Sequence, residues 1–259
     1  MNPAGALALK LVVTPVLIGA ASLVGRRWGS ALSGWLIGIP FTSAPIAFFL
    51  ALDPGPAFAS RAAAAIMAGA ISQAVFCLAF AWTARRAPWA SSLVAGTAGF
   101  GIATAVLTTV VLPVAGAFVV VIIVLVVALF LMPAAPARPG RRVSFPHWDL
   151  PARMAVATAF VVLLTTVAPL LGARMAGLLA PYPLYGGVLA VFAYRLEGVD
   201  ASVAVLRGLL LGLFAFACFF AVLATLLQGE LWLAFAAAIV VAGLVQGTAL
   251  LIGRRWGLA

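Results

Sequence analysis

The chain is a succession of apolar runs of about twenty residues, separated by short polar breaks. A hydrocarbon core about 30 Å thick needs roughly 20 apolar residues for each helix that spans it. Only 8% of the residues are charged and 66% are apolar, whereas about 25% of an ordinary soluble domain is charged. A water-soluble fold cannot bury so much apolar surface. The sequence therefore predicts an all-α polytopic membrane protein.

A transmembrane β-barrel does not fit this pattern. Membrane-spanning strands alternate apolar and polar side chains over about ten residues. Residues 118–132, in contrast, are apolar on every side. We therefore expect spanning helices and no barrel.

The apolar runs predict about nine transmembrane helices, with ends good to a few residues. The longest polar stretch lies between the fifth and sixth runs. We expect it to divide the chain into a first half of five helices (1–133), a cytoplasmic linker (134–151) and a second half of four helices (152–259). The expected helices are 7–25, 30–52, 60–83, 89–110, 114–132, 152–171, 176–196, 201–227 and 231–252.

The positive charges indicate how the helices are oriented. With nine helices, one side of the membrane receives twelve of the fifteen basic residues and the other side three. Because basic loops stay cytoplasmic, we expect the amino terminus outside and the carboxyl terminus in the cytoplasm. Residues 11–25 could alternatively be a signal peptide, but the following Arg26-Arg27 pair favours an outward amino terminus.

The basic residues also indicate the kind of partner and the source organism. They lie in the short segments between apolar runs and not together in one domain, so the net charge of +10 does not indicate a nucleic-acid partner. All of them except Lys10 are arginine, which is typical of a GC-rich bacterial genome, and we expect a bacterial inner-membrane protein. The expected partners are membrane lipids and a small solute, and a homo-oligomer stays an open alternative.

The two halves align with each other without gaps at an offset of 143 residues, and several glycine, proline and aromatic residues match. Five helices in the first half place the start of the second half on the opposite side of the membrane. We therefore expect inverted-topology repeats (5+4), a construction that resembles inverted-repeat secondary transporters in general. The matching pairs are Gly34 and Gly177, Pro40 and Pro183, Phe49 and Phe192, Gly55 and Gly198, Gly69 and Gly212, Phe76 and Phe219, and Trp89 and Trp232.

Two expected helices carry helix-breaking residues at equivalent places. The second reads Gly-Ile-Pro-Phe-Thr-Ser-Ala-Pro over 38–45, and the seventh reads Pro-Tyr-Pro-Leu-Tyr-Gly-Gly over 181–187. Prolines remove backbone donors and clash with preceding carbonyls. Groups freed in this way need neighbours, water or a ligand. We expect both helices to be broken near the membrane midplane, although kinked packing helices are the alternative.

The breaks and two glutamines inside the apolar runs make up the candidate substrate site. A buried amide is costly without partners, so Gln73 and Gln246 either complete the site or join helices. Exposed helix amino termini favour a small organic anion. The candidate substrate-binding residues are Pro40, Thr42, Ser43, Gln73, Tyr182, Pro183, Tyr185, Gly186 and Gln246.

These features favour a secondary transporter or facilitator that works by alternating access. No acidic, basic or histidine residue falls in the middle of an expected helix, which argues against an acid-relay pump. No metal-binding motif or phosphate-binding loop occurs, so we expect no enzyme activity, no metal and no cofactor. A channel, a lipid scramblase or flippase, and a non-transporting accessory subunit are the alternatives.

Overall fold

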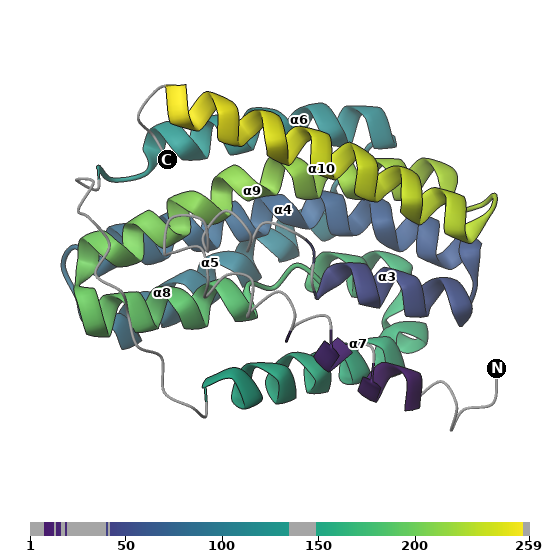
Figure 1. Ribbon diagram of the computed structural model, residues 1–259, viewed down its shortest axis with the longest axis horizontal. Helices are drawn as coiled ribbons and strands as arrows, with labels where there is room; N and C mark the ends of the chain where they lie inside the picture. The colour runs from purple at the N-terminus through teal and green to yellow at the C-terminus, as the bar shows by residue number, and fades with distance from the viewer. Residues whose placement is uncertain are drawn as a thin grey trace.

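A computed structural model describes residues 8–12, 14–16, 19, 40, 42–134 and 149–255 of the chain. The described residues form helices joined by short connections (Figure 1). The second expected helix is described only from Pro40 onward, and most of the linker lies outside the described residues. The helices are α3 (Ser43–Leu52), α4 (Pro56–Ala84), α5 (Trp89–Thr109), α6 (Val114–Leu131), α7 (Asp149–Leu179), α8 (Leu184–Glu197), α9 (Val199–Leu226) and α10 (Leu231–Arg255).

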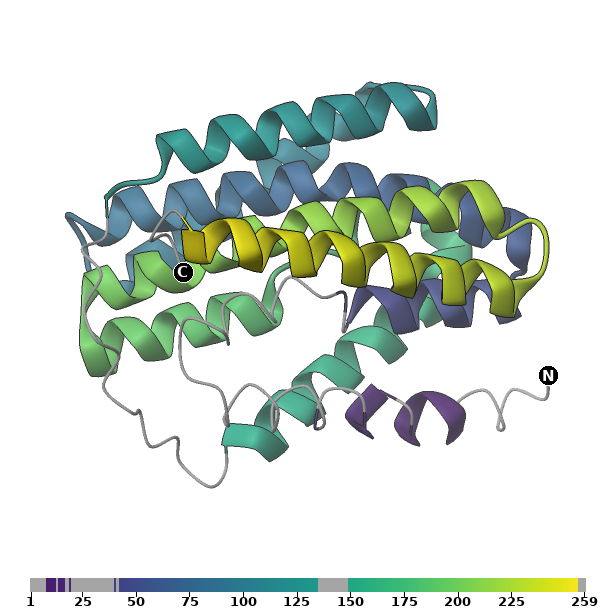
Figure 2. The ribbon, with the colours of Figure 1, turned by 45° about the horizontal axis from the view of Figure 1, so that its top comes forward.

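Six of these helices are long and apolar enough to cross a membrane: α4, α5, α6, α7, α9 and α10. Figures 1 and 2 show α4, α6, α9 and α10 extending between the same two ends of a bundle, with α7 inclined to them. This architecture agrees with the expected multi-pass helical membrane protein. The total of nine spans and the orientation of the termini stay predictions.

Helices α4 and α9 form the centre of the bundle. In each of them 61% of the most apolar stretch is buried, against 17% in α6 and α10. The outer helices expose large apolar side chains such as Phe130, which is 85% exposed. Lipid tails are as apolar as these side chains, so this exposure is compatible with a bilayer. The protein interior is therefore built around one helix from each half of the chain.

Helix α7 consists of two helical segments that meet at a kink at Gly172, which has φ 78° and ψ 160°. A glycine reaches this conformation without the steric cost of a side chain. The expected sixth helix (152–171) ends at this kink, although the helix resumes directly after Gly172 and no loop spans 172–175. The chain leaves the helix again over residues 180–183, and α8 begins at Leu184. The expected seventh helix (176–196) is therefore interrupted beside the prolines at 181 and 183.

The corners that lead into α4 and α9 have the same backbone geometry. Gly55 precedes α4 with φ 125° and ψ 173°, and Gly198 precedes α9 with φ 96° and ψ −175°. The Gly55 N–H donates to the Leu50 carbonyl at 2.9 Å, and the Gly198 N–H donates to the Ala193 carbonyl at 3.1 Å. The two donors lie 143 residues apart in the sequence, and so do the two acceptors. The repeated sequence thus produces the same turn in both halves.

We expect Gly55→Ala and Gly198→Ala each to lower the free energy of unfolding by about 1–3 kcal/mol, because this backbone region is nearly restricted to glycine. No atom lies within 4 Å of a Cβ at either position, so the loss would come from the backbone alone. Unfolding in detergent measures it. Gly101→Ala, inside α5 with equally open surroundings, is the control and should cause no loss. Equal stabilities for all three variants would show that these corners are unstrained.

Candidate functional site

The amino-terminal ends of α3 and α8 meet in the middle of the bundle. From this meeting point the two helices extend in opposite directions (Figures 1 and 2). The Ser43 hydroxyl, at the start of α3, donates a buried hydrogen bond to the Ala180 carbonyl at 3.1 Å. Ala180 belongs to the non-helical segment before α8. A side chain of the first half thus satisfies a carbonyl that the break in the second half leaves open.

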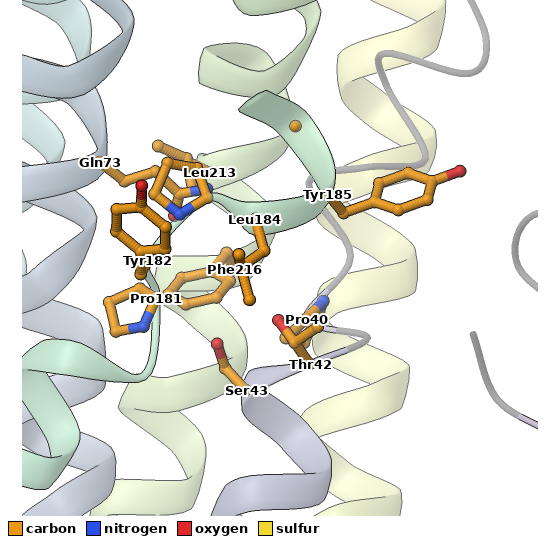
Figure 3. Close-up of a pocket in the computed structure, with 12 residues that line it drawn as sticks. Pro40, Thr42, Ser43, Gln73, Pro181, Tyr182, Leu184, Tyr185, Leu213 and Phe216 are labelled. Carbon is orange, nitrogen blue, oxygen red and sulfur yellow. The ribbon is translucent and has the colours of Figure 1, made fainter. Parts of the chain in front are cut away.

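A cavity of about 30 Å³ lies at this junction (Figure 3). A cavity of this volume holds about two water molecules, so only a solute of a few atoms fits in this conformation. The lining comes from α3, α4, α8, α9 and the non-helical segments before α3 and α8. The lining residues are Pro40, Thr42, Ser43, Gln73, Pro181, Tyr182, Pro183, Leu184, Tyr185, Gly186, Leu213 and Phe216.

Eight of the nine residues selected from the sequence line this one cavity. Gln246 does not line it, although its side chain is only 3% exposed. It lies on α10, which packs against α9 on the outside of the bundle. The contacts of α10 with α3 are made near its other end, where Trp232 and Phe235 pack on Phe48. The sequence shows that Gln246 lies deep in an apolar run, but not which helix borders the breaks. The structure therefore does not bring Gln246 to the candidate site.

The first turn of α8 presents uncapped backbone N–H groups to the cavity, because no side chain caps this amino terminus. The Tyr182 carbonyl, which would accept from Gly186 in a regular helix, accepts from the Leu184 N–H at 2.8 Å. Among the described residues no backbone carbonyl accepts from the Gly186 N–H. The amino terminus of α8 thus directs its dipole and an open donor to this small volume.

The first turn of α3 is mostly satisfied by the backbone before it. The Ala44 N–H donates to the Pro40 carbonyl at 2.8 Å and the Ile46 N–H donates to the Thr42 carbonyl at 3.4 Å. Pro45 has no N–H group.

Gln73 adds an unsatisfied acceptor to the cavity lining. Its side chain reaches from α4 toward the segment before α8 (Figure 3) and is only 7% exposed. Its amide oxygen Oε1 is buried and has no hydrogen-bond partner within the described part of the chain. Leaving a buried polar atom unpaired costs about 1–3 kcal/mol. A donor from a bound solute or from water would remove that cost.

The two lining tyrosines behave differently. The Tyr182 hydroxyl lies 2.9 Å from the Thr97 hydroxyl of α5, and its ring packs edge-to-face on Phe100 with centroids 5.2 Å apart. These contacts hold Tyr182 in one orientation beside the cavity. The Tyr185 ring points away from Gln73 and Tyr182 (Figure 3). We therefore assign Tyr182 a positioning role at the wall, whereas Tyr185 contributes mainly its backbone.

Sequence reasoning missed several residues of this site. Leu213 and Phe216 line the cavity from α9, and Pro181 and Leu184 line it from the non-helical segment and the start of α8. A signal existed for Phe216, which lies 143 residues after Gln73 and so at the equivalent place in the second half. Thr97 is found only through its contact with Tyr182. No lining residue is charged.

Glycines allow the broken segment to lie against α4. A Cβ on Gly69 of α4 would lie 2.4 Å from Cγ of Pro181, and a Cβ on Gly177 would lie 2.4 Å from the Ala62 carbonyl oxygen. Small residues let membrane helices approach this closely. The position of the cavity wall therefore depends on the absence of side chains at these two glycines.

No protein-family model, curated protein or solved structure matches this chain.

We expect Gly69→Ala to lower the free energy of unfolding by about 1–3 kcal/mol, because the added methyl group overlaps Pro181 in a packed interior. Unfolding of the purified protein in detergent measures the change. Gly243→Ala on α10 is the matched control, since no atom lies within 4 Å of a Cβ there. If both variants were as stable as the parent, the broken segment would not be held tightly against α4.

Proposed function

We propose that this protein is a secondary transporter or facilitator that moves a small organic solute, with an anion favoured, across the bacterial cytoplasmic membrane. The observation that carries the proposal is the meeting of the uncapped amino terminus of α8, the start of α3 and the unpaired Gln73 oxygen around one cavity. Such polar groups inside a helical membrane protein require a partner, and a transported solute supplies one. Discontinuous helices of this kind form substrate sites in many transporters.

The proposal includes two inverted repeats, one with five and one with four helices. Support comes from the cavity lining itself, in which four positions of the first half have a counterpart 143 positions later that also lines the cavity. Support also comes from the matching Gly55 and Gly198 corners. A site at the interface of two such repeats is the arrangement expected for alternating access. The recurring lining pairs are Pro40 and Pro183, Thr42 and Tyr185, Ser43 and Gly186, and Gln73 and Phe216.

Contacts between the halves close the bundle at the end where α4 meets α5, which we call the α4–α5 end. Arg85 forms an ion pair with Asp200 at 2.7 Å, and the Tyr194 hydroxyl donates to the Ala87 carbonyl at 3.2 Å. We assign this end to the cytoplasm because of the basic residues around it. Release of these contacts would open the cavity toward the cytoplasm.

A second set of contacts closes the opposite end, where α3 meets α4. The Ser60 hydroxyl donates to the Ala224 carbonyl at 2.8 Å, and the Arg174 guanidinium donates to the Leu107 carbonyl at 2.7 Å. Both sets join the first half to the second. Alternating access would release one set at a time while the other holds. The cavity lining carries no charge, which favours a facilitator or exchanger over a carrier that moves protons through a buried carboxylate.

The alternatives fit the geometry less well. A channel needs a continuous polar path, whereas contacts between the halves lie at both ends of the bundle and the cavity between them has only about 30 Å³. A scramblase or flippase needs a polar groove open to lipid. The groove between residues 11–15 and the start of α7 is lined by apolar side chains and one hydroxyl, that of Thr158. An accessory subunit would have no need of the unpaired Gln73 oxygen.

Reconstitution into liposomes tests the proposal. We expect uptake of labelled small carboxylates that saturates with concentration and is accelerated by unlabelled solute inside the vesicles, because a carrier returns faster when loaded. Thr42→Val combined with Ser43→Ala should lower the uptake at least tenfold by altering the start of α3. Flux that stays linear with concentration and shows no acceleration would identify a channel. Absence of flux for every solute tested would favour an accessory subunit.

We expect Asp200→Asn to increase access to the cavity from the α4–α5 end, because Arg85 loses its charged partner there. The rate at which a water-soluble thiol reagent labels Leu213→Cys, in a background with Cys77 and Cys218 replaced by alanine, measures that access. Stability should change by less than about 1 kcal/mol because the ion pair is partly exposed. Glu230→Gln, at the opposite end, is the control. Equal labelling rates in both variants would mean that Arg85–Asp200 is no gate.

A further inference from the structure

The cavity offers a partial positive charge and, among the described residues, no negative charge. A helix amino terminus is equivalent to roughly +0.5 elementary charge, and the open donors at the start of α8 supply it here. No acidic or basic side chain in the described part of the chain lines the cavity to change this balance. A monovalent anion would be partly neutralised there. A divalent anion would keep more than one unpaired charge in the site, which is strongly unfavourable.

Gln73 requires something that an ordinary anion lacks. Its Oε1 atom is an acceptor, and a carboxylate offers only acceptors. Contact between these two groups would place lone pairs against each other. The ligand therefore needs a hydrogen-bond donor in addition to its anionic group. A hydroxyl next to a carboxylate provides this combination within a few atoms.

The two halves of the chain line the cavity unequally and so orient the ligand. Gln73 of α4 and Phe216 of α9 occupy equivalent positions when the two halves are aligned, and both line the cavity. The donor of the ligand would face Gln73, and its carbon skeleton would face Phe216 and Leu213. The small volume limits that skeleton to two or three carbons.

We infer that the cavity binds a short hydroxy monocarboxylate. Its carboxylate accepts hydrogen bonds from the first turn of α8, including the Gly186 N–H, and its hydroxyl donates to Oε1 of Gln73. The inference rests on the proposed function for the choice of site and names the class of its substrate. Binding itself requires no transport, so the two can fail separately.

Calorimetric titration of the purified protein in detergent tests this inference with three probes: glycolate, acetate and malonate. Glycolate and acetate have the same number of carbons and the same charge, but only glycolate has the hydroxyl. We expect glycolate to bind about tenfold more tightly than acetate, the effect of one hydrogen bond to a buried group. Malonate, a dianion at pH 7, should bind more weakly than either. Failure of glycolate to bind, or malonate binding as tightly as glycolate, would overturn the inference.

Substitutions at Gln73 separate the hydroxyl contact from the charge balance. Gln73→Leu should remove the preference for glycolate while acetate still binds, and Gln73→Met serves as a second variant of similar shape. Gln73→Glu adds a negative charge to the cavity and should abolish binding of both anions. Gln246→Leu, the other buried glutamine, is the control and should keep the parent preference. A preference that survives Gln73→Leu and Gln73→Met, or glycolate binding retained by Gln73→Glu, would refute the assigned contact.

Liposome assays distinguish the two proposals. Glycolate binding with the expected preference, but without accelerated exchange, would overturn transport and leave the ligand class intact. Saturable exchange of other solutes by a protein that does not bind glycolate would overturn the ligand class and leave transport intact.

Discussion

The need to satisfy peptide groups inside a membrane governs this structure. An unbroken helix satisfies its own N–H and carbonyl groups, whereas a segment that leaves the helix cannot do so in lipid. Residues 180–183 are such a segment, and the buried hydrogen bond from Ser43 to the Ala180 carbonyl supplies one missing partner. The first turn of α8 receives no side-chain cap. Its open groups border a cavity at the junction of the two halves.

Packing explains how so irregular a segment is held in place. Gly69 and Gly177 let the broken segment and the end of α7 lie directly against α4. Tyr182 is fixed by Thr97 and by an aromatic contact on the neighbouring α5. The broken segment is thus held by α4, one of the two most buried helices, and by α5. Under the proposed function, the movement required for transport is left to the contacts at the two ends.

The sequence predicted much of this arrangement because its strongest signals are physical constraints of the membrane. Apolar run length indicated the class, and paired prolines indicated the break between α7 and α8 to within a few residues. The prediction failed where the outcome depends on packing. Nothing local distinguishes Gln73, on a central helix, from Gln246, on a peripheral one. The expected end of the sixth helix coincides with the kink at Gly172, but the helix resumes at once where a short loop was expected.

The exchange rate of the Gly186 amide hydrogen tests the central claim most directly, because it reports whether a peptide group deep in the bundle is open to solvent and solute. Residue-resolved exchange of the protein in lipid nanodiscs provides this rate. We expect Gly186 to exchange at least tenfold faster than Ala190, one turn further into α8, although both residues are buried. Equal protection of the two amides would mean that α8 begins as a closed helix end, and the case for a solute site at the break would fail.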